Sequence, residues 1–232
     1  MRKLLTGIAV LVLSLGAARA EVVLRLPTQE RVVALTFDAC EQQKPNKLDT
    51  GISDYLVAHH IPFTIFLSGR FVQDNEAAVK ALSKLDFVEL ENHSWDHPNR
   101  MPRLSDDAVR DEVLKTDDEI ARVTGRRTAF FRFPAITYDA RTLGDVEALG
   151  FVVVHYRWEV GDPDPHETAN RIVNETLEGT RPGDILINHI NGRGWHTAEA
   201  LPRMIAGLEA KGFRFVLLKD YLTAKRSRVA GQ

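Results

Sequence analysis

Short apolar runs rich in β-branched and aromatic residues alternate with longer segments of helical periodicity along most of the chain. Runs that are apolar at consecutive positions are typical of strands buried on both faces, as in a parallel sheet. Seven such runs cover residues 31–37, 63–67, 87–90, 129–132, 151–156, 184–188 and 213–218. The amphipathic segments between them predict helices over residues 48–60, 75–83, 106–124, 140–149, 167–177 and 197–211.

This alternation predicts an α/β fold, specifically an irregular (β/α) barrel with about seven parallel strands. A doubly wound open sheet is the alternative, because periodicity does not show whether the sheet closes. Ser105 is expected to cap the helix over residues 106–124. Gly150 and Gly212 stand where helices are expected to end before strands.

The first 20 residues have the composition of a secretory signal peptide. Arg2 and Lys3 precede an apolar stretch at residues 4–15, and Ala18-Arg19-Ala20 supplies small residues before Glu21. An uncleaved anchor is the alternative, but the stretch is shorter than the ~20 residues that a membrane span needs. We therefore expect a periplasmic or secreted protein, with residues 21–232 forming one domain without a membrane span.

The charges of the chain are balanced, with 30 basic and 32 acidic residues. This balance argues against nucleic acid or an anionic membrane surface as the partner, and favours a neutral partner such as a glycan. Cys40 is the only cysteine of the sequence, so no internal disulfide can form. We expect a monomer whose domain is held together by packing.

Unusual polar residues follow or end five of the predicted strands. They are Asp38, the pair His93 and His97, Arg132, Asp162 and His189. Any one of them alone would be interpreted as a solvated loop residue. In a parallel barrel, however, all of these positions lie at the C-terminal face, where active sites are found. Five segments are therefore expected to contribute to one site.

Two of these residues, His93 and His97, are four residues apart in a loop that follows a predicted strand. Imidazole is a common ligand of zinc, and this spacing allows both rings to reach one metal ion. The sequence therefore predicts a metal site at this loop.

Five segments also carry a resemblance to a known family. LTFD at 35–38, NHSWDH at 92–97, FRFP at 131–134, WEVGDP at 158–163 and ILINH at 185–189 resemble, in order, its five motifs. The family is that of the polysaccharide deacetylases, also called the NodB homology domain or carbohydrate esterase family 4. The segment from Thr197 through Phe213 is similar to the closing helix and strand of that family. The resemblance extends from about residue 31 to residue 220.

The resemblance implies a distorted (β/α) barrel that removes acetyl groups from N-acetylated, sometimes O-acetylated, sugars with a divalent metal, usually zinc. His93 and His97 would bind the metal, which would acidify a water and polarise the acetyl carbonyl. Asp38 would act as general base, and His189 would protonate the departing amine.

The same resemblance assigns supporting roles. Arg132 would orient Asp38, and Asp162 would orient and charge His189. A backbone N–H in the segment after Pro134 would hold the developing oxyanion together with the metal.

The chain departs from the family pattern at two positions. Ala39 stands where the resemblance implies a second, metal-binding aspartate, and a methyl group cannot bind zinc. Catalytic zinc generally has three protein ligands, so either another residue supplies the third or the site binds metal weakly. The candidates for the third ligand are Glu41, Glu91, Cys40 and Asp38 itself.

The second departure is Ala135, where the family usually has tyrosine. Its backbone N–H is unchanged, so the oxyanion contact can persist while a wall of the substrate site is lost.

The three tryptophans, Trp95, Trp158 and Trp195, all lie beside motif segments. Indole rings suit the apolar faces of sugars. Together with Ala135, Trp95 and Trp195 are expected to contact substrate. Trp195 is the stronger candidate, because it lies in a Gly-rich loop. Trp158 is as well explained by core packing.

Three functions are compatible with the sequence. The first is a metal-dependent deacetylase of polysaccharide or cell-wall glycan. The second is a non-catalytic glycan-binding relative that lost a metal ligand. The third is a hydrolase of other amides or esters, since the same water activation serves them.

Overall fold

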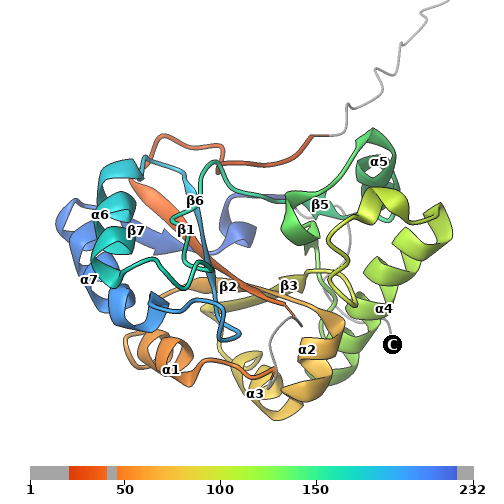
Figure 1. Ribbon diagram of the computed structural model, residues 1–232, viewed down its shortest axis with the longest axis horizontal. Helices are drawn as coiled ribbons and strands as arrows, with labels where there is room; N and C mark the ends of the chain where they lie inside the picture. The colour runs from red at the N-terminus through yellow and green to blue at the C-terminus, as the bar shows by residue number, and fades with distance from the viewer. Residues whose placement is uncertain (1–20, 41–45, 224–232) are drawn as a thin grey trace, which may run out of the picture.

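Seven parallel strands form one sheet that curls into a half-barrel (Figure 1). The computed structural model describes residues 21–40 and 46–223, so the predicted signal peptide at residues 1–20 lies outside it. The strand order is β5-β4-β3-β2-β1-β6, and β7 pairs with the first half of β1. The strands are β1 (Val32–Ala39), β2 (Phe63–Leu67), β3 (Val88–Asn92), β4 (Phe130–Phe131), β5 (Val152–Val153), β6 (Ile185–His189) and β7 (Arg214–Val216).

Helices connect the strands and cover the outer face of the sheet (Figure 1). They are α1 (Thr50–Ala58), α2 (Gly69–Asp74), α3 (Glu76–Leu82), α4 (Asp106–Thr124), α5 (Ala140–Ala148), α6 (Ala169–Gly179) and α7 (Thr197–Ala210). Short 3-10 turns occur at Met101–Arg103, Pro134–Ile136 and Leu218–Asp220. No helix in the described ranges is both long and apolar enough to cross a bilayer.

The predicted irregular barrel is confirmed. Strands β1 to β5 are neighbours in chain order, and β6 returns to the free edge of β1, which is the cyclic order of a (β/α) barrel. The sheet does not close by pairing β5 with β6. Instead, the segment before β1 spans the gap: Val23 bridges Val154 in parallel, and Arg25 bridges Asp184 in antiparallel fashion.

The helix boundaries follow the predicted caps. Ser105 precedes α4, and its hydroxyl accepts a hydrogen bond from the Ala108 N–H at 3.3 Å. Gly150 and Gly212 both adopt positive φ after helices, at 89° and 80°, where residues other than glycine are strained.

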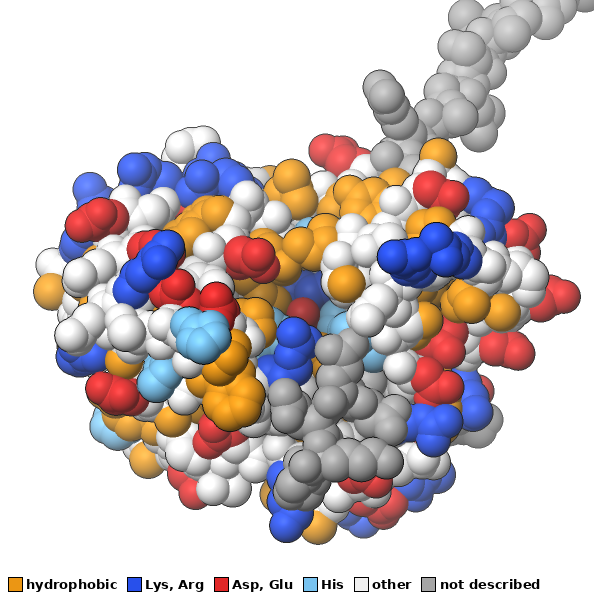
Figure 2. Space-filling model, in the orientation of Figure 1, with side chains coloured by type: hydrophobic (Ala, Val, Ile, Leu, Met, Phe, Trp, Pro, Cys, Tyr) orange, Lys and Arg blue, Asp and Glu red, His pale blue; other side chains and the backbone are white. Residues whose placement is uncertain are grey.

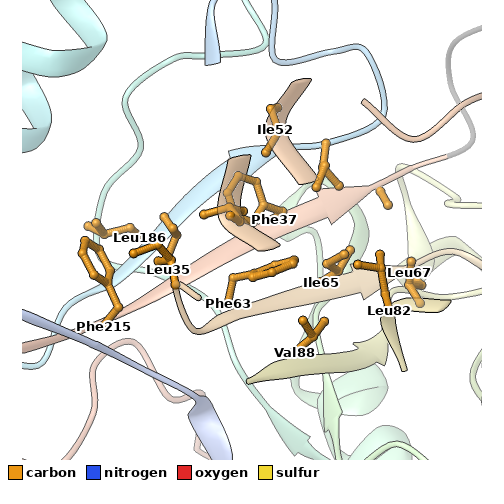
Figure 3. Packing of buried hydrophobic residues seen from close by; sticks show 14 of the residues in the cluster. Leu35, Phe37, Ile52, Phe63, Ile65, Leu67, Leu82, Val88, Leu186 and Phe215 are labelled. Carbon is orange, nitrogen blue, oxygen red and sulfur yellow. The ribbon is translucent and has the colours of Figure 1, made fainter. Parts of the chain in front are cut away.

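The central strand β1 is buried on both faces. Leu35, Phe37 and Ala39 point toward the helices and pack with Ile52 of α1 and Phe63 of β2 (Figure 3). The alternate residues point the other way, into the half-barrel: among them Val32 and Ala34 belong to a second apolar cluster. Because strand side chains alternate between faces, Asp38 and Cys40 belong to this inner face, and Ala39 does not.

Candidate active site

A cleft of about 510 Å³ opens at the carboxyl ends of the strands, within the size range of small-ligand sites. Figure 2 shows this face hollowed at its centre, where basic, acidic and histidine side chains gather. The cleft is lined by Asp38, Cys40, His97, Asn99, Arg132, Phe133, Ala135, Ile136, Tyr156, Glu159, Pro163, His189 and Arg193. Residues from five predicted segments therefore do meet in one place.

Asp38 lies in β1 and is held by a buried arginine. Its Oδ1 accepts a hydrogen bond from Arg132 Nη1 at 2.7 Å, and its Oδ2 lies 3.5 Å from His93 Nε2. The Arg132 guanidinium is itself fixed, since it stacks 4.0 Å from the centre of the Phe66 ring. Burial raises the pKa of Asp38, but the charges of Arg132, His93 and His189 outweigh it and lower that pKa to about 2. The carboxylate is thus ionised and oriented.

His189 ends β6 and is the register partner of Asp38 across the two parallel strands. Its Nδ1 lies 2.9 Å from Asp162 Oδ1, and its backbone N–H donates to Asp162 Oδ2 at 2.7 Å. Burial lowers the pKa of His189, but the charge and hydrogen bond of Asp162 raise it to about 10. Asp162 therefore both orients the imidazole and stabilises its protonated form.

The Asp162 carboxylate has a further partner at the start of α7. Thr197 Oγ1 donates to Asp162 Oδ2 at 2.8 Å. Gly194 makes this approach possible, because a Cβ there would lie 2.4 Å from Thr197 Oγ1 and 2.6 Å from the His189 carbonyl oxygen. The loop between β6 and α7 thus fixes the Asp162–His189 pair.

Cys40, His93 and His97 form a buried cluster whose ligand atoms all lie within 4.8 Å of one another. His93 Nδ1 lies 2.8 Å from the Arg132 carbonyl oxygen. Since a carbonyl only accepts, Nδ1 carries a proton, and Nε2 is the ring nitrogen that a neutral His93 can offer to a metal in the cluster. Burial raises the pKa of the Cys40 thiol, but the surrounding histidines hold it well below its usual value.

The histidine loop is held by α4. Glu112 Oε2 accepts hydrogen bonds from the backbone N–H groups of Trp95 and Asp96, at 2.8 and 3.0 Å. Ser94 and His97 both adopt positive φ, at 68° and 53°, a conformation that is uncommon outside glycine. The loop is therefore bent sharply and clamped, which aims both rings at one point.

Trp95, which was predicted to contact substrate, is almost fully buried and is not among the residues that line the cleft. Its side chain is 7% exposed and packs on Gly69, where a Cβ would lie 2.1 Å from the indole. The Lys115 ammonium also lies over the ring, 4.1 Å from its centre. Trp95 is therefore part of the packing that supports the histidine loop.

The other two tryptophans differ in exposure. Trp158 packs against Gly179, and its indole N–H donates to Asp184 at 3.4 Å, which supports the core interpretation. Trp195 is 51% exposed in the loop after β6, two residues beyond Arg193 of the cleft lining. It is placed where a bound glycan could reach it, and its contact with substrate stays a prediction.

The segment after Pro134 borders the cleft with an unusual backbone. Ala135 and Ile136 have φ of 49° and 54°, and for a β-branched residue such as Ile136 this is a strained conformation. The N–H groups of Ile136 and Thr137 donate within the turn, to the carbonyls of Phe133 and Pro134. Among residues 135–137, the Ala135 N–H is the one that makes no hydrogen bond within the turn, and the resemblance assigns the oxyanion contact to an N–H of this segment.

A buried histidine lies behind this segment, stacked on aromatic rings. His155 lies parallel to Tyr138 and Phe133, with ring centres 5.4 and 6.1 Å away. Neither of its ring nitrogens has a hydrogen-bond partner among the described residues. Burial, helped by the Arg132 charge, lowers the pKa of His155 to about 3. The ring therefore functions as an uncharged aromatic surface.

His155→Phe is expected to remove part of the acid sensitivity of the fold. The unfolded chain binds this proton below about pH 6.5, whereas the folded chain does not until about pH 3. As the pH is lowered from about 6.5 to about 3, the free energy of unfolding should therefore decrease. This residue contributes up to about 1.4 kcal/mol per pH unit to that decrease. Urea unfolding between pH 7 and 4 should give a shallower fall for the variant, with stability at pH 7 unchanged or higher. His166→Gln, at an exposed loop position, is the control; equal slopes for His155→Phe and wild type would contradict the assignment.

Comparison with known proteins gives the family. A sequence profile described as polysaccharide deacetylase matches residues 25–154. The chain belongs to the polysaccharide deacetylase family. The resemblance noted from the five motifs is thereby confirmed.

Relatives in the polysaccharide deacetylase family match most of this chain. It is 26% identical over 208 residues to PdaA, a peptidoglycan-N-acetylmuramic acid deacetylase of Bacillus subtilis, covering 87% of this chain and 75% of PdaA. It is 27% identical to a bifunctional xylanase/deacetylase of Pseudobutyrivibrio xylanivorans, over 84% of this chain, and spans about a third (31%) of that longer protein.

Solved structures of the polysaccharide deacetylase family share the fold. The Bc1960 peptidoglycan N-acetylglucosamine deacetylase has a TM-score of 0.81 and 25% identity, covering 90% of this chain and 96% of that chain. BA3943 of Bacillus anthracis, a family 4 pseudoenzyme, has a TM-score of 0.75 and 25% identity over 89% of this chain and 70% of that chain. Because the fold includes a pseudoenzyme, activity has to be argued from the site itself.

Polysaccharide deacetylases generally depend on a metal, and the residues present here fit one. The donors of Cys40, His93 and His97 are buried together, and they are nitrogen and sulfur ligands of the kind that zinc takes. His93 is 1% exposed, and its Nε2 has no hydrogen-bond partner among the residues described. Ala39, by contrast, points into the core on the other face of β1.

Several site residues were not predicted from the sequence. Glu112 and Thr197 support the site from α4 and α7, and Asn191 Nδ2 donates to the Cys40 carbonyl. These contacts depend on tertiary structure. Cys40 was one of four candidates for the third metal ligand, and the structure places its sulfur beside His93 and His97.

Proposed function

We propose that this protein is a metal-dependent hydrolase that removes acetyl groups from the N-acetylated, sometimes O-acetylated, sugars of a polysaccharide or cell-wall glycan. One observation carries the proposal. Asp38 and His189 are register partners on β1 and β6, each with its own buried partner, at the rim of the Cys40, His93 and His97 cluster. A base, an acid and a set of metal donors therefore border the same cleft.

A divalent ion bound by the cluster would polarise the acetyl carbonyl and lower the pKa of the attacking water. Asp38 accepts the proton that this water loses as its oxygen forms the new C–O bond. Arg132 keeps the Asp38 carboxylate in place at 2.7 Å. The Ala135 N–H donates a hydrogen bond to the developing oxyanion, and the left-handed backbone of the segment fixes this donor in advance.

His189 completes the reaction as general acid. The amide C–N bond breaks, and the departing nitrogen takes a proton from His189 Nε2, because the other ring nitrogen is held by Asp162. The products are acetate and a free amino sugar. Asp162, itself held by Thr197, keeps the imidazole protonated and directed toward the cleft.

The test is acetate release from an N-acetylglucosamine oligomer, measured before and after chelation. We expect the rate of acetate release to fall by at least about 100-fold on metal removal, as for loss of electrostatic activation. The rate should recover when a divalent ion is added back. Dialysis against buffer without chelator is the control. Retention of full activity after complete metal removal would contradict the proposal.

The same assay separates two other functions. BA3943 shows that this fold also serves a pseudoenzyme, so glycan binding without acetate release would favour a binding protein. Acetate release from esters but from no amide would favour a hydrolase of other acyl substrates. Each of these outcomes would overturn the N-deacetylase proposal.

We also propose that the protein acts after export, in the periplasm or outside the cell. The basic start, apolar stretch and small residues of positions 1–20 support this location. Mass spectrometry of the protein from its host should find Glu21 as the first residue. A mature chain that retains residues 1–20 would contradict cleavage.

A further inference from the structure

The site has two histidine donors in the family's positions and lacks the aspartate expected beside them. In this chain β1 remains extended as far as Ala39. Strand side chains alternate, so Asp38 and Cys40 project into the half-barrel while Ala39 packs among core residues beneath the helices. A third ligand at the next inward position after Asp38 is therefore residue 40.

The other candidates for the third ligand are occupied or differently placed. Glu91 Oε2 accepts hydrogen bonds from the backbone N–H groups of Ala129 and Phe130, at 2.8 and 2.7 Å. Glu91 thus satisfies backbone N–H groups at the start of β4. Asp38 Oδ1 is bound to Arg132 at 2.7 Å, which suits a base, and its Oδ2 lies 3.5 Å from His93 Nε2, beside the cluster. Glu41 lies outside the described residues.

Two independent observations single out Cys40. Its sulfur lies within 4.8 Å of a ligand nitrogen on each of His93 and His97. The second observation is that the buried Nε2 of His93 has no hydrogen-bond partner in the described part of the chain. The other ring nitrogen, Nδ1, donates to the Arg132 carbonyl, so Nε2 faces the cluster. Asn191 anchors the Cys40 carbonyl from the loop after β6.

We propose that Cys40 is the third protein ligand, so that the metal is held by one thiolate and two imidazoles in place of one carboxylate and two imidazoles. This inference rests on the proposed metal dependence and deepens it. A thiolate is a softer ligand than a carboxylate, so the site should favour zinc and cobalt over magnesium, calcium and manganese. It also leaves Asp38 free of the metal, as its role as base requires.

Cobalt binding gives a direct test, because Cys40 is the only cysteine of the sequence. The metal-free protein is titrated with Co²⁺ alone, and the near-ultraviolet charge-transfer band of a cobalt thiolate is recorded. We expect this band at one equivalent of Co²⁺. Cys40→Ser should abolish it and weaken Zn²⁺ binding by more than the roughly 10- to 100-fold typical of outer-shell changes.

Cys40→Asp is the matched variant, since it restores a carboxylate donor. It should bind Zn²⁺ without the cobalt thiolate band, and its preference for Mn²⁺ relative to Zn²⁺ should rise. His59→Ala, at an exposed position after α1, controls for nonspecific effects. Circular dichroism of each variant reports whether it folds, and the band of the unmutated protein remains informative if a variant does not.

The outcomes separate the two proposals. Bound Co²⁺ without a thiolate band, together with unchanged Zn²⁺ affinity in Cys40→Ser, would overturn Cys40 as a ligand and leave metal-dependent deacetylation standing. A metal-free protein that binds neither Co²⁺ nor Zn²⁺ would overturn both. A thiolate band without acetate release from any glycan would support the ligand and refute the proposed function.

Discussion

Asp38→Asn is expected to reduce kcat for acetate release from an N-acetylglucosamine oligomer by about 100- to 10,000-fold, the usual range for loss of a general base. The amide keeps the size of the carboxylate, and its oxygen can still accept from Arg132 Nη1, which lies 2.7 Å from the Asp38 carboxylate. What it loses is the ability to take a proton from water. KM should change far less than kcat, because Asp38 acts on the water and not on the sugar.

The control for this substitution is Asp86→Asn, an exposed position in the turn before β3, at the opposite ends of the strands. The Asp38→Asn variant also leaves the buried Arg132 charge without its counter-charge, which is expected to lower stability. Thermal unfolding therefore has to confirm that the variant is folded at the assay temperature. A folded variant with near wild-type kcat would rule out Asp38 as the base.

His189→Ala is expected to lower amide hydrolysis by at least about 100-fold, as for loss of a general acid. An amine is a poor leaving group unless it is protonated. The phenolate of an aryl acetate leaves readily without a proton. The variant should therefore lose much less activity on an aryl acetate than on the N-acetylated oligomer. The ratio of the two losses is the informative quantity, measured with the same enzyme preparation.

His59→Ala serves as the control for this substitution, since it removes an exposed histidine after α1. If His189 only supports the fold or the metal, both substrates should lose activity equally. An equal loss, or no loss on the amide, would contradict the role of His189 as the acid that protonates the amine.

The fold could be predicted from the sequence because strand and helix periods differ. The runs at residues 63–67 and 106–124 coincide with β2 and α4. The helix α2 was missed: it is short and begins at Gly69, capped by the Ser68 hydroxyl, so it has no helical period to detect. Strands β4 and β5 are shorter than predicted, because two residues of each pair with a neighbour.

The main residues of the site were predicted from the sequence, but the residues that hold its loops, such as Glu112 and Thr197, were not. Asp38, Arg132, Asp162, His189 and the histidine pair are brought together, because parallel strands place their carboxyl ends on one face. The burial of Trp95 could not be predicted, since it depends on Gly69 from a distant segment. The proposed role of Cys40 as the third ligand was one of four alternatives in the sequence, and choosing it required the structure, in which β1 extends through Ala39.

The central place of β1 determines the order in which the molecule can be assembled. On one side β1 pairs with β2, which follows soon in the chain, but it also pairs with β6 and β7 near the other end. The Thr36 hydroxyl bonds the Leu186 carbonyl across 150 residues. Contacts of such long range form slowly, and until they form β1 has an open edge that invites aggregation. Asp38 and His189 therefore become neighbours only when the last third of the chain has docked, and a partly folded chain has no complete active site.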